Sequence, residues 1–172
     1  MMFRSHLTVA LLACAALPAC SRACSVAHIV TGQELVTGAD AIVRARAVGY
    51  VGFPVFTFWT TGKPDSKVRF QVVETLRGNL PTELKINGYL SDRDDFNDDK
   101  VPYTFVRPGG RAGSCIANTY RRGGEYLLFL KVDRDGSLNA TWAALSPVNE
   151  QLHNDHDPWL LWTREQVRLL GK

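Results

Sequence analysis

The chain has few of the residues and patterns that mark several common protein classes. Only 4 of its 172 residues are cysteine, too few for a small scaffold built on a dense disulfide framework. The formal net charge of +3 is too small to point to a nucleic-acid or anionic-lipid partner. The sequence has neither a Gly-rich loop of the phosphate-binding type nor a Gly-x-Ser-x-Gly nucleophile motif. The usual signatures of nucleotide-binding enzymes and of serine hydrolases are therefore excluded.

A long apolar run occurs only at the N-terminus. Arg4 precedes an apolar stretch at residues 7–17, which small residues follow. A basic start, an apolar centre shorter than the roughly 20 residues that span a bilayer, and a small-residue end are typical of a secretory signal. We expect residues 1–19, or 1–23, to be a signal peptide and residues 24–172 to form one exported domain.

The sequence allows two ends for this signal. The residues Leu-Pro-Ala-Cys that end at Cys20 resemble a bacterial lipobox, in which the cysteine is acylated and becomes the mature N-terminus. This ending predicts a lipoprotein of the bacterial cell envelope, held on the membrane by lipidation at Cys20. Cleavage after Ala23 would instead give a secreted or periplasmic chain that begins at Cys24.

The cysteines are compatible with both ends. If Cys20 is acylated or removed, Cys24 and Cys115 remain as one pair in an oxidising compartment, and we predict a disulfide between them. A bridge across 91 positions would stabilise the fold by roughly 4–5 kcal/mol in the chain-entropy account. The alternative makes Cys115 a nucleophile that works with a histidine, although no neighbouring residue supports it.

Alternating apolar and polar residues indicate about five or six short strands. The candidate ranges are 39–50, 67–76, 82–89, 125–132 and 137–145, with 103–106 as a weaker one. Small side chains share one face of the first range, which predicts a tightly packed interior. One barrel core is expected to hold Ile42 or its neighbours, Val68, Phe70, Val72, Leu127 and Phe129.

Two capping boxes predict helices. Thr31 with Glu34 should open a short helix that stops near Gly38, and Thr163 with Gln166 should open a C-terminal helix through Leu170. Many short strands, few helices and frequent turns predict a small antiparallel barrel.

Several segments resemble the tissue inhibitors of metalloproteinases and related netrin-like domains in order and spacing. The similar segments are 39–48, 68–78, Ser114 with Cys115, 123–129, 133–141, and Pro158 with Trp159 and the last helix. The resemblance implies a mainly β fold, a five-stranded OB-type Greek-key barrel with short flanking helices. The family begins with the motif Cys-x-Cys, whereas this chain has Cys24, Ser25 and Val26. The chain therefore lacks the second cysteine of that motif.

The resemblance also implies one specific activity. In that family, the free amine and the carbonyl of an N-terminal cysteine chelate the catalytic zinc of a metalloprotease, and a small Ser or Thr follows. Cys24 and Ser25 would take these positions. The resemblance implies three bridges in the family, and this chain lacks cysteines in pairs, so that one bridge remains. Paired losses favour a shared fold and leave open whether this chain inhibits a protease.

Two stretches offer metal ligands. Residues 153–157 contain His153 and His156 among carboxylates, and residues 95–99 begin like a calcium loop. The first stretch precedes a proline in a loop, and the second has Lys100 where the loop needs glycine. We expect solvated loops with no metal, no cofactor and no catalytic residue. A metal-dependent hydrolase that uses both histidines is a third hypothesis.

Two further clusters bear on partners. A modest basic cluster consists of Arg107, Arg111, Arg121 and Arg122, but export argues against a nucleic-acid partner. An aromatic run is expected to be either core or an exposed binding patch, and consists of Phe53, Phe56, Phe58 and Trp59. The leading hypothesis is an exported, lipid-anchored, non-catalytic module that binds an unidentified protein. Metalloprotease inhibition is the alternative, and the oligomeric state is not predicted.

Overall fold

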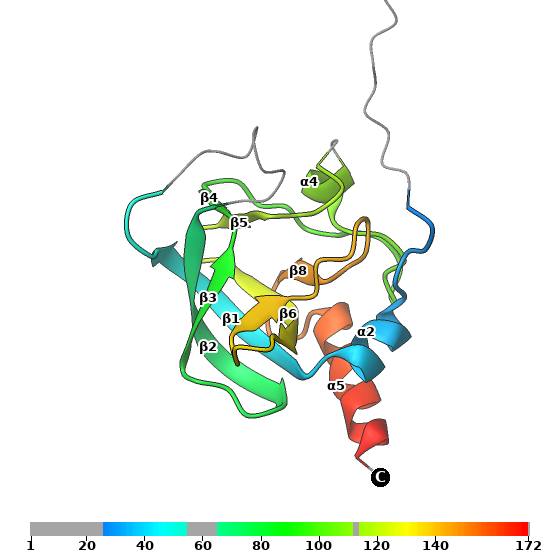
Figure 1. Ribbon diagram of the computed structural model, residues 1–172. Helices are drawn as coiled ribbons and strands as arrows, with labels where there is room; N and C mark the ends of the chain where they lie inside the picture. Colours follow the sequence, from blue (N-terminus) through cyan, green and yellow to red (C-terminus); the bar gives the residue numbers. More distant parts are fainter. Residues whose placement is uncertain (1–25, 55–64, 112–113, 172) are drawn as a thin grey trace, which may run out of the picture.

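A computed structural model describes residues 26–54, 65–111 and 114–171. The fold is mainly β, with a few short helices (Figure 1). The strands are β1 (Ala41–Tyr50), β2 (Lys67–Arg77), β3 (Glu83–Asn87), β4 (Tyr89–Ser91), β5 (Thr119–Arg121), β6 (Glu125–Val132), β7 (Leu138–Ala140) and β8 (Asn149–Leu152). The described helices are α2 (Gly32–Gly38), α4 (Pro108–Arg111) and α5 (Pro158–Leu170).

The main sheet is antiparallel and curls into a nearly closed barrel. Its strand order is β3–β2–β1–β6–β7, and β8 also pairs with β6. The two ends of this order, β3 and β7, lie next to each other (Figure 1). Three register shifts interrupt the β1–β2 ladder, and such bulges increase the twist that bends a sheet toward closure. A separate parallel pair, β4–β5, lies near the end of the barrel that is uppermost in Figure 1.

The barrel interior confirms the predicted small-residue face of the first strand. Ala41, Val43, Ala45 and Ala47 are buried there. Small side chains on β1 leave room for Phe70, Tyr120 and Tyr126, whose rings meet edge to face. The other interior residues are Val68, Leu84, Ile86, Leu128, Leu130 and Ala140.

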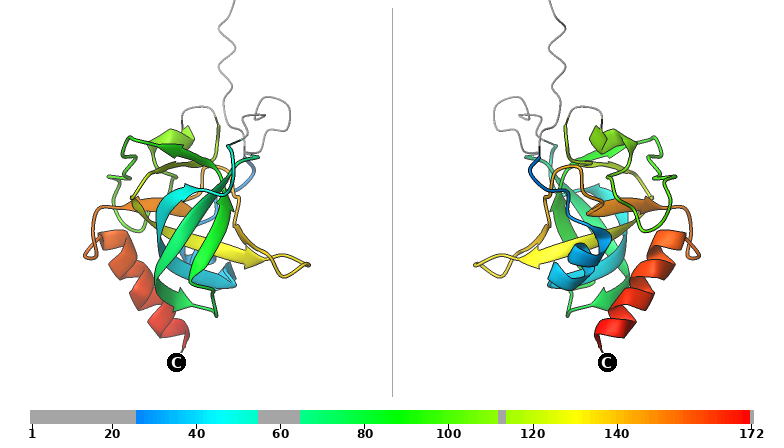
Figure 2. Two further views of the ribbon diagram at one scale, coloured as in Figure 1. Left: turned by 90° about the vertical axis from the view of Figure 1, so that its left-hand side faces the viewer. Right: turned by 90° about the vertical axis from the view of Figure 1, so that its right-hand side faces the viewer.

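A second core lies outside the barrel, so the prediction of one shared core was wrong. Ile42, Leu127 and Phe129 point away from the interior and pack against α2 and α5. These helices lie side by side on one flank of the barrel (Figures 1 and 2). Both faces of β1 and β6 are covered, and alternation within a strand cannot assign its faces when both are buried.

One of the two predicted helix starts is confirmed. Thr31 and Glu34 form the expected capping box, with the Thr31 amide donating to Glu34 Oε2 at 2.7 Å. Helix α5 begins at Pro158, earlier than expected, because the Asp157 side chain accepts from the Trp159 amide and caps it. Thr163, the predicted cap, is a buried residue in the middle of this helix.

Two strand predictions also need correction. Residues 103–106, all of them described, form no strand, and the predicted strand at 137–145 shortens to β7. The sequence pattern does not predict β8, which is Asn-Glu-Gln-Leu and is buried at all four positions. Buried polar side chains break the apolar alternation, so periodicity gives no signal there.

Candidate functional site

Several predicted site residues lie outside the described residues. Cys20, Cys24 and Ser25 belong to this group, as do the aromatic residues of the run that follow Phe53. Lipidation at Cys20 and the Cys24–Cys115 disulfide therefore stay predictions. Cys115 itself is described and has a φ of 62°, a left-handed conformation that is uncommon for a residue with a side chain.

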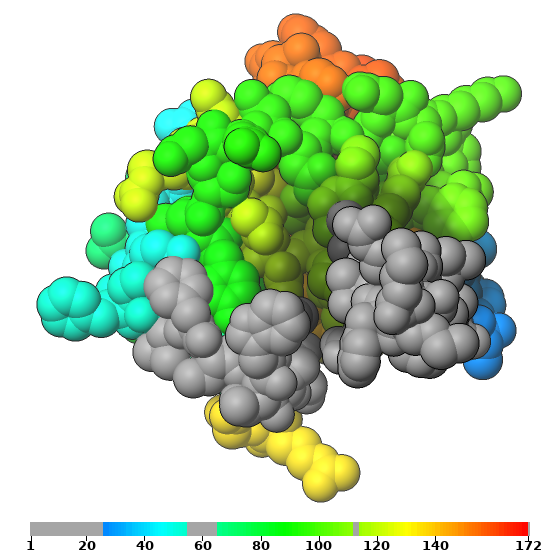
Figure 3. Space-filling view, turned by 90° about the horizontal axis from the view of Figure 1, so that it is seen from above, coloured from blue at the N-terminus to red at the C-terminus, as the bar shows by residue number. Residues whose placement is uncertain are grey.

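The start of the described chain and the Cys115 segment are both attached to one turn. The Val30 amide donates to Ser146 Oγ at 2.8 Å, and the Leu145 amide donates to the Cys115 carbonyl at 2.6 Å. Leu145 also has a positive φ, of 58°. Figure 3 shows the end of the barrel that is uppermost in Figure 1. The blue N-terminal residues lie on one edge of this end, and the cyan end of β1 lies on the opposite edge. The turn thus brings the incoming chain and Cys115 to one end of the barrel.

Arg107 is completely buried and is bonded to the segment that follows Cys115. Its guanidinium pairs with the Asp95 carboxylate, and it donates to the carbonyls of Asn149 at 3.1 Å and Ala117 at 3.2 Å. The rings of Tyr120 and Tyr126 lie 5.6 and 5.3 Å from its central carbon, within cation–π range. Arg107 is therefore an internal cation, which the grouping of four arginines from the sequence did not predict.

Glu150 is the buried acid of the same cluster. Its Oε1 accepts from the Arg107 amide at 3.2 Å, and its Oε2 accepts from Asn97 Nδ2 at 2.9 Å. Burial raises the pKa of Glu150 to about 7, and the nearby Arg107 charge and these two donors offset only part of that effect.

This buried cluster joins three segments that are far apart in the sequence. Asp95 and Asn97 come from the loop after β4, Ala117 lies two residues after Cys115, and Asn149 and Glu150 belong to β8. The Asn149 side-chain amide adds a bond to the Ala117 carbonyl at 2.6 Å. The cluster therefore fixes the Cys115 segment on the barrel. It also corrects the prediction that residues 95–99 are wholly solvated, because Asn97 is buried.

The two predicted ligand-rich stretches meet at His153. Its Nδ1 lies 3.1 Å from Asp157 Oδ2, its Nε2 lies 3.5 Å from Asp98 Oδ1, and its ring stacks on Phe96. The His156 ring lies 3.8 Å from the Asp155 carboxylate and is 84% exposed. Among the described residues, no group of three or more His, Cys, Asp or Glu side chains is placed to hold a metal ion.

Two of the other arginines in the predicted basic cluster are paired with acidic residues of the loop after β4. Arg111 pairs with Asp99, and Arg121 Nε lies 3.0 Å from Asp94 Oδ1. These two pairs neutralise part of the positive charge of the cluster, whereas Arg122 is exposed. Counting basic residues in the sequence could not show that an acidic loop faces two of them.

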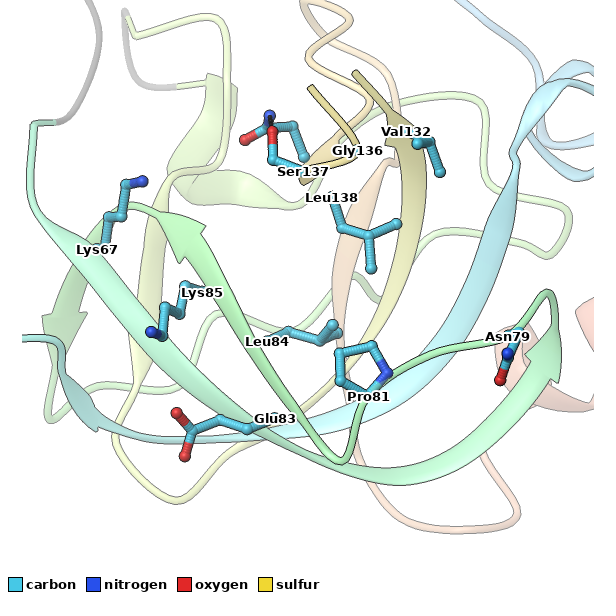
Figure 4. A pocket seen from close by; sticks show the side chains of 11 residues that line it. Lys67, Asn79, Pro81, Glu83, Leu84, Lys85, Val132, Gly136, Ser137 and Leu138 are labelled. Atoms are coloured by element: carbon cyan, nitrogen blue, oxygen red, sulfur yellow. Dashed lines mark hydrogen bonds between the residues drawn. The ribbon is translucent and has the colours of Figure 1, made fainter. Parts of the chain in front are cut away.

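A hollow of about 500 Å³ follows the seam between β3 and β7 (Figure 4). Its apolar part comes from Pro81, Leu84, Val132 and Leu138, and Lys67 and Lys85 lie toward one side (Figure 4). The lining of the hollow offers no histidine, cysteine or paired carboxylates for chemistry.

Among the described residues, no helix is both long and apolar enough to cross a membrane. Comparison with known proteins gives no assignment, because no family model and no curated protein matches the chain.

Proposed function

We propose that this chain is an exported, lipid-anchored, non-catalytic module that binds a protein partner through an OB-type barrel of the netrin-like kind. The observation that carries the fold is the strand order. In a five-stranded OB-type Greek-key barrel, the first strand pairs with the second and the fourth, and the third lies next to the fifth. The strands β1, β2, β3, β6 and β7 follow this order, with β1 between β2 and β6 and with β3 beside β7.

The binding face that we propose is the end of the barrel that bears Cys115. Val30 and Cys115 are bonded to the adjacent residues Ser146 and Leu145. Cys24 precedes Val30 by six residues, and six extended residues reach about 20 Å. This reach is compatible with the predicted bridge from Cys24 to Cys115, which would make the N-terminal segment a rigid part of the face.

The use of the charged side chains supports binding over catalysis. Asp157 caps α5, Asp95 neutralises Arg107, and Glu150 accepts from Asn97 and from the Arg107 amide. Each of these acids already has a structural role. A recognition module needs such a rigid scaffold, because preorganised surfaces lose less entropy on binding.

Point variants on opposite ends of the molecule test this proposal. We expect the wild-type chain to form one defined cross-linked complex in envelopes of its native host, and Ala27→Arg to reduce that complex about tenfold or more. Ala27 is exposed, so the substitution should leave the fold intact. Leu170→Arg, at the C-terminal end of α5, is the matched control and should leave the complex unchanged. Equal yields from both variants would contradict the proposed face.

Inhibition of a metalloprotease is the second candidate, and the same attachment at Ser146 favours it. A chain that begins at Cys24 would present a free amine beside Cys115, whereas a chain acylated at Cys20 has an ordinary peptide bond there. Intact-mass analysis of native protein should show diacylglycerol on Cys20. A species that begins at Cys24, and that loses inhibition of a zinc protease after N-acetylation, would replace the leading proposal.

A further inference from the structure

The segment 99–111 carries an aromatic side chain that is exposed and yet belongs to an ordered part of the domain. Phe105 is 43% exposed. Its carbonyl accepts from the side-chain amide of the buried Asn97 at 2.8 Å, and the amide of the next residue, Val106, donates to the Leu145 carbonyl at 2.8 Å. These bonds fix the main chain on both sides of the ring. An exposed anchor with an ordered backbone loses less entropy when a partner covers it.

Arg111 restricts the Phe105 ring further. The central carbon of its guanidinium lies 6.0 Å from the ring centroid, at the limit of the cation–π range. The same guanidinium donates to the Val106 carbonyl and pairs with Asp99. Because Arg111 is itself held by these bonds, the exposed part of the Phe105 ring has a defined position.

A hollow of about 650 Å³, which we call the Phe105 hollow, lies beside this ring. Its lining combines apolar with charged side chains and includes Asp99, Lys100, Val101, Pro102, Phe105 and Arg111. Apolar surface with a few placed charges is typical of a pocket that accepts a group of its ligand in one orientation.

The charges of the Phe105 hollow favour an acidic partner group. Arg111 and Asp99 pair with each other, whereas Lys100 is exposed and forms no ion pair with any residue that the structure describes. Asp98, the neighbouring acid, lies outside the lining and is 3.5 Å from His153 Nε2. One positive charge of the lining is therefore left for a carboxylate of the partner.

The Phe105 hollow adjoins the face that we propose for the partner. The Leu145 carbonyl accepts from the Val106 amide, and the Leu145 amide donates to the Cys115 carbonyl. Val101 and Val30 belong to the same apolar cluster. Helix α4, which ends this segment, lies at the end of the barrel that is uppermost in Figure 1. The hollow is thus continuous with the N-terminal residues and with Cys115.

We propose that the Phe105 hollow anchors the protein partner by accepting an apolar side chain that has a carboxylate close by, with the carboxylate facing Lys100. The inference rests on the proposed function and adds the chemistry of the contact to it. An exposed, preorganised aromatic beside an arginine is the kind of residue that contributes most to an interface. A lipid surface fits less well, because the charges of Asp99 and Lys100 would have to leave water.

Photo-cross-linking at two positions tests the site. Benzoylphenylalanine replaces Phe105 in the full chain expressed in its native host, and it replaces Val132 in a matched control. Val132 is 50% exposed and belongs to the hollow between β3 and β7. We expect one protein adduct at position 105, at least about tenfold above position 132, with the cross-link within about three residues of an Asp or Glu of the partner. Equal adducts at both positions, a phospholipid adduct, or a cross-linked segment without an acidic residue would overturn the proposal.

Substitutions test the two groups separately in the complex expected for the proposed function. Phe105→Ala should reduce that complex about tenfold or more, whereas Phe105→Leu, which keeps an apolar side chain, should retain most of it. Lys100→Glu should reduce it by a similar factor, and Lys100→Arg, which keeps the charge, should not. Both side chains are exposed, so all four variants should unfold at nearly the wild-type temperature.

The Ala27→Arg variant separates this inference from the proposed function. If Ala27→Arg reduces the complex while Phe105→Ala and Lys100→Glu leave it intact, the anchor fails and the proposed face stands. If only the Phe105 and Lys100 variants reduce it, the anchor stands and the N-terminal residues lie outside the face. If the wild-type chain forms no defined complex, the proposed function fails, and the anchor fails with it.

Discussion

Asn97 Nδ2 donates to Glu150 Oε2 at 2.9 Å across a fully buried contact. This bond connects an acidic loop to a strand that lies 53 positions later in the chain. Both partners are polar, and neither can reach solvent. The loop after β4 is therefore part of the packed domain, and its attachment depends on the ionisation of one carboxyl group.

The stability of the domain should depend on pH through Glu150. Burial raises its pKa from 4.5 in the unfolded chain to about 7 in the folded chain. Because the folded state then holds the proton more tightly, this group contributes stability below about pH 4.5, and that contribution is lost as the pH rises through about 7. The free energy of unfolding should fall by about 3 kcal/mol across this window.

Urea unfolding at a series of pH values measures the effect. Glu150→Gln should flatten the profile between pH 5 and 8 because it removes the titrating group, while Glu165→Gln, on the exposed side of α5, should retain the wild-type slope. A wild-type profile that rises steadily over this window would show that the pKa of Glu150 is lowered, and the prediction would fail.

Arg107 should be the most sensitive charged residue of the fold. Arg107→Ala leaves Glu150 and Asp95 without their buried cation, and removing one partner of a buried pair typically destabilises by about 3–5 kcal/mol. Arg168→Ala breaks its pair with Glu165, which is about half exposed on each side, so its cost should be only a small fraction of that.

Hydrogen exchange adds a positional readout to the stability measurement for Arg107. Because the guanidinium holds the Ala117 carbonyl, Arg107→Ala should increase exchange at residues 114–118 more than in the barrel strands. Uniform loss of protection across the chain would argue that Arg107 has no specific role at that segment.

The sequence predicted the features that depend on residues close together in the chain. The alternation on β1 placed Ala41 and Val43 on the interior face correctly, because side chains on a strand alternate between its two faces. The capping box at Thr31 is likewise a local bond between residues three positions apart. The capping-box pattern at Thr163 predicted a wrong helix start, because Asp157 caps α5 and Thr163 lies within the helix.

The candidate site could not be predicted because its bonds are long-range. Arg107 has the same local signature as any loop arginine, and only folding places Tyr120 and Tyr126 beside it. Glu150 and Asn97 look like solvated residues for the same reason. The meeting of the 95–99 loop with His153 depends on the path of β8, which periodicity does not reveal.

The barrel interior provides a test of strand placement. Phe70 is fully buried on β2, and its ring centroid lies 4.9 Å from that of Tyr120. Phe70→Ala should destabilise the domain by about 3–5 kcal/mol, since it removes an aromatic side chain and leaves a cavity. Val73→Ala, on the exposed face of the same strand, should change stability by less than about 1 kcal/mol. Equal effects in thermal unfolding would mean that the two faces of β2 are assigned wrongly.

The predicted disulfide should both stabilise the fold and hold the N-terminal segment at the proposed binding face. If Cys24 and Cys115 are bridged, Cys115→Ser should lower the free energy of unfolding by several kcal/mol, because the unfolded chain gains the freedom of a loop of about 91 residues. Reducing agent should destabilise the wild-type chain by a similar amount and should leave Cys115→Ser unchanged. Non-reducing peptide mapping identifies the partner directly. Two free thiols at these positions would remove the bridge, and the N-terminal segment would then depend on the bond between Val30 and Ser146 for its position at this end of the barrel.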